Sequence, residues 1–224
     1  MTRKMSPFIY VLHSLGDRFD ELSGLVMETE QIYKLEASDL EKSFTYVPEV
    51  DQEGKAESYV EDIIRFQKDF PNQFRKAMIV TWYSYFETEL GEIVNILNQI
   101  SSSSDSCPSN EKIPWIEKLI DRVDGICTSK LKGDSSWALI DNARRLRNNI
   151  VHSDGRVKHK DELVGLKKYL EKEKNYFKYS DARYYEINDG YLEYLCMKTK
   201  DYLRKVLRTA MKYSDSISHE SLEG

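Results

Sequence analysis

The sequence predicts an all-α protein, a bundle of long helices with room for one short β-hairpin. Apolar residues recur at intervals of three and four over most of the chain, which is the spacing of helices with one buried face. Glycine and proline are sparse, at 10 and 5 in 224 residues. A many-turned β fold needs more of both. The hydrophobic content of 40% over this length is enough to form a proper core.

The first 70 residues predict helices joined by one loop. Residues 7–43 have helical spacing throughout and form one long helix or two helices in line. An apolar run follows the early basic pair, but acids interrupt this run within about ten residues, so we interpret this stretch as an amphipathic helix and not a signal peptide. The segment "TYVPEVDQEG" indicates a loop, and residues 55–70 a second helix. We expect residues 1–70 to be an N-terminal helical extension.

The most apolar segment follows Pro71, which can occupy the first turn of a helix that runs to about Ile100. Its buried face is predicted to contain Met78, Trp82, Tyr85, Phe86, Leu90 and Ile93. The stretch "SSSSDSCPSN" is then a linker, and "IPWIEKLIDRV" is a short helix that stops near Gly125.

A further helix is predicted from a cap at Asp134 or Ser135 through His152, with Trp137, Ile140, Leu146 and Ile150 toward the core. Gly155 suits the left-handed residue that commonly ends a helix. Residues 159–177 predict another helix, "ARYYEINDGYL" a short strand and tight turn, and Tyr191 to about Tyr213 a final helix. We therefore expect a helical domain over 71–213 and a disordered tail over 214–224, within one compact unit overall.

Charge is distributed unevenly. The net charge of −5 argues against a polyanion binder as a whole. Residues 17–62 contain 14 acids against 4 bases, a balance of −10, whereas residues 144–160 contain 6 bases against 1 acid, a balance of +5. The basic segment is either an anion-binding face or a solvated helix face.

Cysteine and histidine usage predicts neither a metal site nor a cofactor site. The three cysteines and four histidines are widely spaced, without the spacing of metal ligands. An odd number of scattered cysteines is typical of a reducing compartment, so we expect a cytoplasmic protein. No stretch approaches the roughly 18 uncharged apolar residues of a membrane span, so we expect no membrane association.

The stretch "LRNNIVHSDG" is the strongest candidate site. Asn148 and His152 are four residues apart and share one helix face, whereas Arg147 lies about 140° around from His152. The negative end of the helix dipole favours a protonated imidazole. A proton donor, a guanidinium that holds phosphate oxygens and a polar amide together suit phosphodiester cleavage. The alternative is structural, because histidine and asparagine are both common at helix C-termini.

The segment "RNNIVH" matches the Arg-x(4–6)-His motif of the HEPN superfamily, and the chain resembles these domains over roughly Pro71 to Tyr213. The earlier segment "WYSYFETELGEIV", with Glu87, is similar to the superfamily's aromatic core helix. The order of long helix, loop and motif helix ending in a glycine turn also agrees. Many HEPN domains are metal-independent endoribonucleases of toxin–antitoxin, abortive-infection and other defence systems, built at a homodimer interface.

The resemblance implies a role for each motif residue. Arg147 would stabilise the scissile phosphate, His152 would act as general acid or base toward the RNA 2′-hydroxyl, and Asn148 would orient them or contact substrate. A subfamily that pairs with nucleotidyltransferase antitoxins continues His-x-Tyr, but this chain has Asp154 there. Asp154 would instead hydrogen-bond His152 or cap the turn.

Further residues complete the predicted site. Glu87 either reaches the Arg147 guanidinium or faces solvent. The remaining bases of the segment are expected to contact RNA, namely Arg144, Arg145, Arg156 and Lys158.

The function expected from the resemblance is a metal-independent endoribonuclease, a toxin or anti-phage defence component with RNA as its substrate. Its partners would be a second copy of the chain and an antitoxin or defence-system protein. Two alternatives remain open at this point. One is a non-catalytic HEPN-like module that binds RNA, nucleotides or proteins, and the other is an unrelated helical protein that uses its acidic N-terminal helix as a partner surface.

Overall fold

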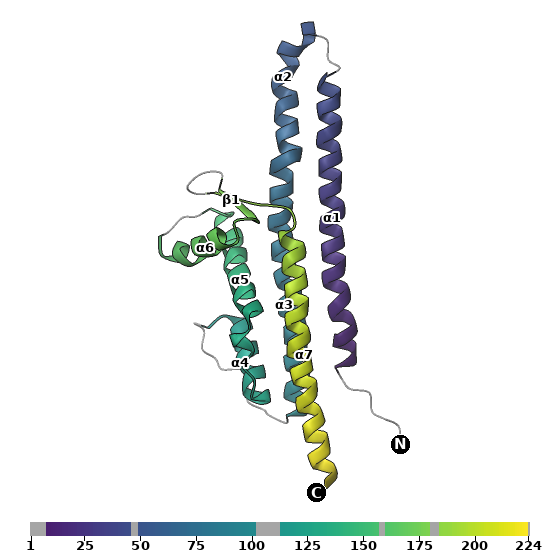
Figure 1. Cartoon of the computed structure of the whole chain (residues 1–224), viewed down its shortest axis with the longest axis vertical. Coiled ribbons are helices and arrows are strands. Elements are labelled where there is room, and N and C mark those ends of the chain that lie inside the picture. Colours follow the sequence, from purple (N-terminus) through teal and green to yellow (C-terminus); the bar gives the residue numbers. More distant parts are fainter. Residues whose placement is uncertain (1–7, 46–48, 102–112, 157–159, 180–183, 224) are drawn as a thin grey trace. The chain divides into compact units, whose positions relative to one another are not determined.

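The computed structural model describes residues 8–45, 49–101, 113–156, 160–179 and 184–223, and it confirms the all-α prediction. Within these ranges there are seven α-helices and one two-stranded sheet (Figure 1). The elements are α1 (Ile9–Thr45), α2 (Glu49–Ile64), the π-helix η1 (Arg65–Asp69), α3 (Phe70–Ile100), α4 (Trp115–Cys127), the 3₁₀-helix η2 (Leu131–Gly133), α5 (Ser135–Ser153), α6 (Lys160–Lys172), β1 (Phe177–Tyr179), β2 (Tyr185–Ile187) and α7 (Tyr191–Glu223).

The chain divides into two compact units, each assembled from separate stretches. Unit 1 comprises Met1–Asp20, Trp82–Arg144 and Tyr194–Gly224. Unit 2 comprises Glu21–Thr81 and Arg145–Glu193. The boundary that the sequence predicts at residue 70 falls inside the first stretch of unit 2.

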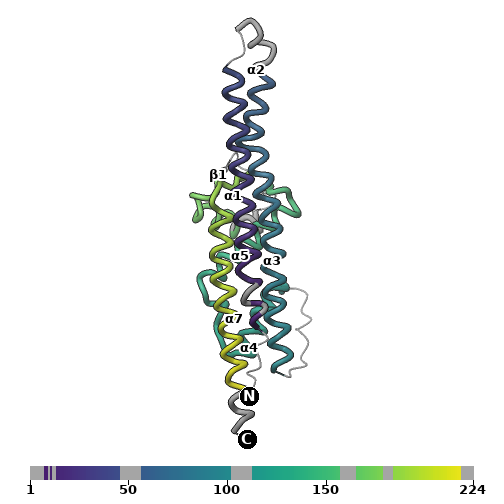
Figure 2. The backbone as a smooth tube through the Cα atoms, turned by 90° about the vertical axis from the view of Figure 1, so that its right-hand side faces the viewer, coloured from purple at the N-terminus to yellow at the C-terminus, as the bar shows by residue number. Residues whose placement is uncertain are grey.

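Unit 1 is a helical bundle with an aromatic centre. Its part of α3 and its part of α7 lie between the start of α1 on one side and α4 with α5 on the other (Figures 1 and 2). Trp82 stacks on Phe86, and its indole Nε1 donates a hydrogen bond of 3.0 Å to Thr199 Oγ1. Tyr202 contacts both Phe86 and Trp137. The predicted buried face is thus largely confirmed, although Met78 (in unit 2) and Tyr85 are only half-buried.

A buried carboxylate lies in unit 1 at Glu89, a residue that the sequence does not single out. The Glu89 side chain is 0% exposed, whereas most other buried residues of α3 are apolar. Arg18 Nη1 of α1 lies 3.1 Å from Glu89 Oε1, and Ser14 Oγ donates to Oε2 at 3.5 Å. Burial raises the pKa of Glu89, and Arg18 only partly offsets this.

We expect Glu89→Gln to change how stability depends on pH. Between the ordinary glutamate pKa of about 4.5 and the raised value, the folded protein retains a proton that the unfolded chain has lost. The free energy of unfolding of the wild type therefore falls as the pH rises through this interval. The neutral amide has no such dependence, so the variant should gain stability relative to the wild type as the pH rises.

The measurement is chemical denaturation of both proteins at several pH values. Glu28→Gln is the matched control, since Glu28 is exposed on α1 and is not among the groups that shift the pKa of Glu89. The prediction would be contradicted if the free energies of unfolding of the wild type and Glu89→Gln differed by the same amount at every pH.

Unit 2 contains a helical hairpin in which α1 runs beside the helix formed by α2, η1 and α3 (Figure 1). This second helix is continuous, whereas the sequence predicts a new helix at Pro71. The π-helix precedes the proline, and the Phe70 N–H bonds the Arg65 carbonyl five residues back. A proline lacks the N–H and crowds the carbonyl four residues back. The wider π segment accommodates Pro71 without ending the helix.

The small sheet of unit 2 confirms the predicted strand, but the predicted turn does not join its two strands. β1 and β2 are antiparallel, with Phe177 opposite Ile187. Phe177 packs edge-on against Tyr185 and Tyr191, which explains why residues beyond Lys172 leave the predicted helix. The predicted turn at Asp189 and Gly190 is present, with Gly190 at φ +78°, but it leads into α7 and does not join the strands.

Two other boundaries differ from expectation. The predicted loop over residues 45–54 is shorter, because α2 already begins at Glu49 and includes Gly54. An isolated glycine is tolerated in a helix at a cost of about 1 kcal/mol. α7 continues to Glu223, through residues for which a disordered tail is predicted, since extending an existing helix adds one hydrogen bond per residue. The predicted linker at residues 101–110 lies almost wholly outside the described residues.

Candidate functional site

The motif residues lie where the capping pattern predicts, on the last turns of α5. Asp134 Oδ1 accepts a hydrogen bond of 2.8 Å from the Ser136 N–H, as expected of an N-cap. Leu146 is fully buried and Ile150 half-buried. Every α5 residue after Leu146 is half-buried or exposed, so the segment from Arg147 to His152 lies at the surface of unit 2.

Arg147 and Asn148 contact each other directly. Arg147 Nη1 donates to Asn148 Oδ1 at 3.1 Å, and both side chains are half-buried. His152 follows one turn later and is exposed. The arrangement therefore combines a partly desolvated guanidinium, oriented by an amide, with an imidazole open to solvent on the same helix end.

The second asparagine of the motif, Asn149, joins α5 to the sheet region. Its Oδ1 accepts a hydrogen bond of 2.9 Å from the Tyr185 hydroxyl on β2. Its Nδ2 donates to the Arg156 carbonyl at 2.9 Å. Sequence reasoning missed this role, because only a contact with a strand 36 positions away distinguishes Asn149 from Asn148.

A buried lysine completes the C-terminal cap of α5. Lys76 of α3 is only 6% exposed, and its Nζ donates to the Asp154 carbonyl at 3.2 Å. A cation there compensates the partial negative charge of the helix end. Asp154 and Gly155 both adopt positive φ, at 53° and 71°, so two left-handed residues end the helix where one was predicted. We call Lys76, Asn149, Gly155 and Tyr185 the α5 cap.

Arg145 and Arg156, two of the predicted RNA-binding residues of unit 2, are exposed but differ in their contacts. Arg145 lies near Gly165 of α6, where an added Cβ would be 3.1 Å from Arg145 Nη1. Arg156 forms a β-bridge with Tyr184, and its guanidinium lies over that ring at 5.4 Å. Lys158 lies outside the described residues. Arg145 and Arg156 thus lie on either side of the motif (Arg147 to His152) in sequence and remain candidates for phosphate contacts.

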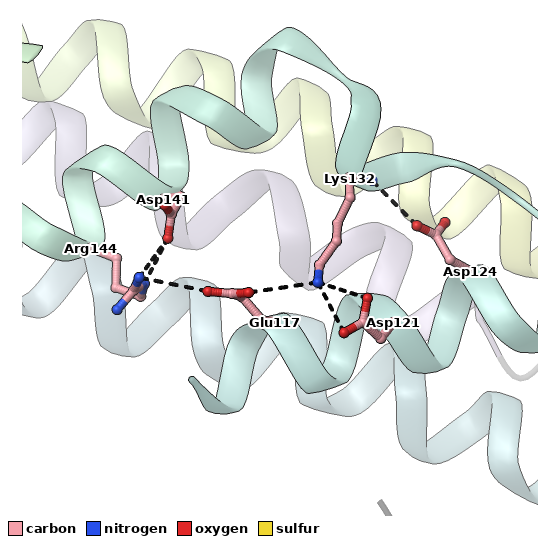
Figure 3. Close-up of polar contacts among 6 residues, drawn as sticks. All are labelled: Glu117, Asp121, Asp124, Lys132, Asp141 and Arg144. Atoms are coloured by element: carbon pink, nitrogen blue, oxygen red, sulfur yellow. Dashed lines mark hydrogen bonds and ion pairs between the residues drawn. The ribbon is translucent and has the colours of Figure 1, made fainter. Parts of the chain in front are cut away.

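Arg144 has a different environment, in unit 1. Its Nη2 lies 2.7 Å from Asp141 and 3.7 Å from Glu117 (Figure 3). Lys132 Nζ of η2 joins Glu117 to Asp121, so two cations and three carboxylates alternate across α4, η2 and α5. These pairs hold the Arg144 guanidinium, and its predicted contact with RNA would require them to open.

The two supporting residues lie in different units. Glu87 is half-buried on α3 in unit 1, and its predicted contact with Arg147 stays a prediction. Asp154 is exposed, and its backbone N–H donates to the Ile150 carbonyl at 2.9 Å. Asp154 therefore contributes to the turn through its backbone.

Comparison of the chain with known protein families, characterised proteins and solved structures gives no match. In the described ranges, no helix is both long and apolar enough to span a bilayer. In the same ranges, His, Cys, Asp and Glu side chains do not gather in threes around a possible metal position. Any functional conclusion therefore depends on the motif itself.

Proposed function

We propose that this protein is a metal-independent endoribonuclease of the HEPN type that acts in the cytoplasm as a toxin or anti-phage defence component. One observation carries the proposal: Arg147 is oriented by Asn148 on the same exposed helix end that presents His152. The alternative is a HEPN-like module that binds RNA or protein without cleaving it.

The chemistry follows from these three side chains. The 2′-hydroxyl of the substrate attacks the adjacent phosphorus, and the 5′-oxygen of the next nucleotide leaves. His152 takes the hydroxyl proton or protonates the leaving oxygen. Arg147 stabilises the charge that develops on the phosphate oxygens, since its planar fork matches two of them. The products are a 2′,3′-cyclic phosphate, or the 3′-phosphate after hydrolysis, and a 5′-hydroxyl end.

The α5 cap supports a catalytic interpretation. A general acid or base acts efficiently only when its position is fixed to within a fraction of an ångström. Asn149 and Lys76 fix the helix end through side chains that are not predicted to contact substrate, and Gly155 does so through its left-handed backbone. A module that binds RNA or protein without cleaving it would not need the helix end to be positioned so closely.

The experiment is RNA cleavage by the purified full chain in the presence of EDTA. A single-stranded RNA should be cut to cyclic-phosphate or 3′-phosphate ends, which phosphatase and kinase treatments distinguish. A matched substrate with one 2′-deoxynucleotide should resist cleavage at that position, because the nucleophile is missing. Binding of RNA without cleavage would favour the non-catalytic module.

We further expect the site to require a homodimer. Val151 beside His152 is 49% exposed, and Ile150 is half-buried, so the motif adjoins apolar surface that a second copy can cover. Because Arg147 lies about 140° around the helix from His152, two chains can combine these groups.

A mixing experiment checks the dimer. Arg147→Ala and His152→Ala should each be inactive alone, but chains mixed under exchange conditions should regain a fraction of wild-type activity in heterodimers. Equal inactivity of the mixture, with a monomeric wild type in sedimentation, would contradict this expectation.

A further inference from the structure

The part of α1 in unit 2 has an exposed apolar face. Leu25, Ile32 and Leu35 are 50%, 56% and 54% exposed. They lie away from the buried face of the same helix, which contains Leu22, Val26 and Ala37. Single exposed apolar residues are ordinary, but these three share one face.

The spacing of these residues is that of a helix-pairing seam. Leu25 and Ile32 are seven positions apart and Leu35 follows after three, so all three lie within an arc of about 80°. Intervals of seven and three are the a and d positions of a heptad. Met27 is also exposed, at 61%, but it lies about 140° around from Ile32 and therefore outside this face.

Acidic side chains lie within and beside this face, because Glu21 and Glu28 occupy d positions of the same heptad and Glu36 lies about 20° beyond Leu25. Glu21, Glu28 and Glu36 are exposed and have no ion-pair partner among the described residues. Asp39 continues the heptad and is paired with Lys42 at 3.0 Å. Lys34, the other lysine of this part of α1, pairs instead with Asp189 at 3.1 Å. The three apolar side chains thus share their helix face with uncompensated negative charge.

We infer that the outer face of α1, defined by Leu25, Ile32 and Leu35, binds an amphipathic helix of a partner protein that carries lysine or arginine beside its apolar residues. The heptad spacing selects a helix as the occupant, and the unpaired glutamates in and beside the face select a helix with basic residues next to its apolar ones. A second copy of the chain fits less well, because its own glutamates would face Glu21, Glu28 and Glu36. The inference is independent of the proposed ribonuclease activity.

The test measures binding of two synthetic three-heptad peptides to the full-length protein by fluorescence anisotropy. Both peptides have leucine at the contact positions, one with lysine and the other with glutamate at the flanking positions. The lysine peptide should bind more tightly, and its affinity should fall as salt rises.

Two matched variants separate docking on this face from general attraction to an acidic protein. Ile32→Glu and Met27→Glu add the same charge to exposed positions of the same helix, and thermal unfolding should show both to be folded. Ile32→Glu should weaken the lysine peptide by about tenfold or more, in spite of its extra negative charge, because a buried apolar contact is lost. Met27→Glu should bind as well as the wild type or better.

Equal affinity of both variants for the lysine peptide would overturn the inference. So would wild-type self-association that Ile32→Glu abolishes, since the face would then be an interface between two copies.

Discussion

His152→Ala is expected to lower the rate of RNA cleavage by about 10²- to 10⁴-fold, the usual contribution of a positioned general acid or base. The proton transfer then falls to water, while Arg147 and Asn148 still bind the phosphate. Because His152 is exposed at the helix end, the fold should be almost unaffected. Single-turnover cleavage with saturating enzyme measures the loss at the chemical step.

Each control variant carries the same substitution at a histidine or arginine outside the motif. His219→Ala removes a histidine remote in sequence from the motif and should leave the rate unchanged. Arg147→Lys should also be impaired, because an ammonium does not reproduce the planar fork, whereas Arg208→Lys at an exposed position of α7 should not. Equal slow cleavage by the wild type and His152→Ala would mean that the activity is a contaminant.

Gly155→Ala should destabilise the protein by about 1 to 3 kcal/mol. Gly155 has φ +71°, where an L-residue is strained. A Cβ at this position would also lie 3.0 Å from both Cε and Nζ of Lys76. The lysine would have to move, although its Nζ donates to the neighbouring Asp154 carbonyl.

Gly24→Ala is the matched control, because the same chemical change there should stabilise the protein by up to about 1 kcal/mol. Gly24 lies within α1, and its Cβ would meet no atom within 4 Å. Urea denaturation of the two variants measures the contrast. If Gly155→Ala is as stable as the wild type, the left-handed turn and the Lys76 contact are not important to the fold.

Helices and their caps were predictable from the sequence because they depend on local chemistry. Periodicity placed the long helices, and Asp134 and Gly155 marked the start and end of α5. The π-helix before Pro71 was not predictable, since the same residues are compatible with a helix break. The length of α2 and α7 was underestimated because glycine and polar residues weaken a helical pattern without ending the helix.

The candidate site was predictable only in part. The spacing of Arg147, Asn148 and His152 identifies the helix end, but not its supports. Lys76, Asn149 and Tyr185 come together from α3, α5 and β2, and no local pattern reveals such contacts. Glu89 was missed for a related reason, since burial of one glutamate among several on α3 depends on the packing of Arg18 and Ser14 from α1.

The link between Asn149 and Tyr185 has a consequence for the order of events during synthesis. The motif leaves the ribosome before β2 does, because Tyr185 follows Asn149 by 36 positions. A chain that has been translated only through Gly155 contains every proposed catalytic group but lacks the tyrosine that secures the helix end. Since domains fold as their segments become available, a nascent or prematurely terminated chain would carry the motif in an unsecured form. The fully formed site would then exist only after the sheet region has been synthesised.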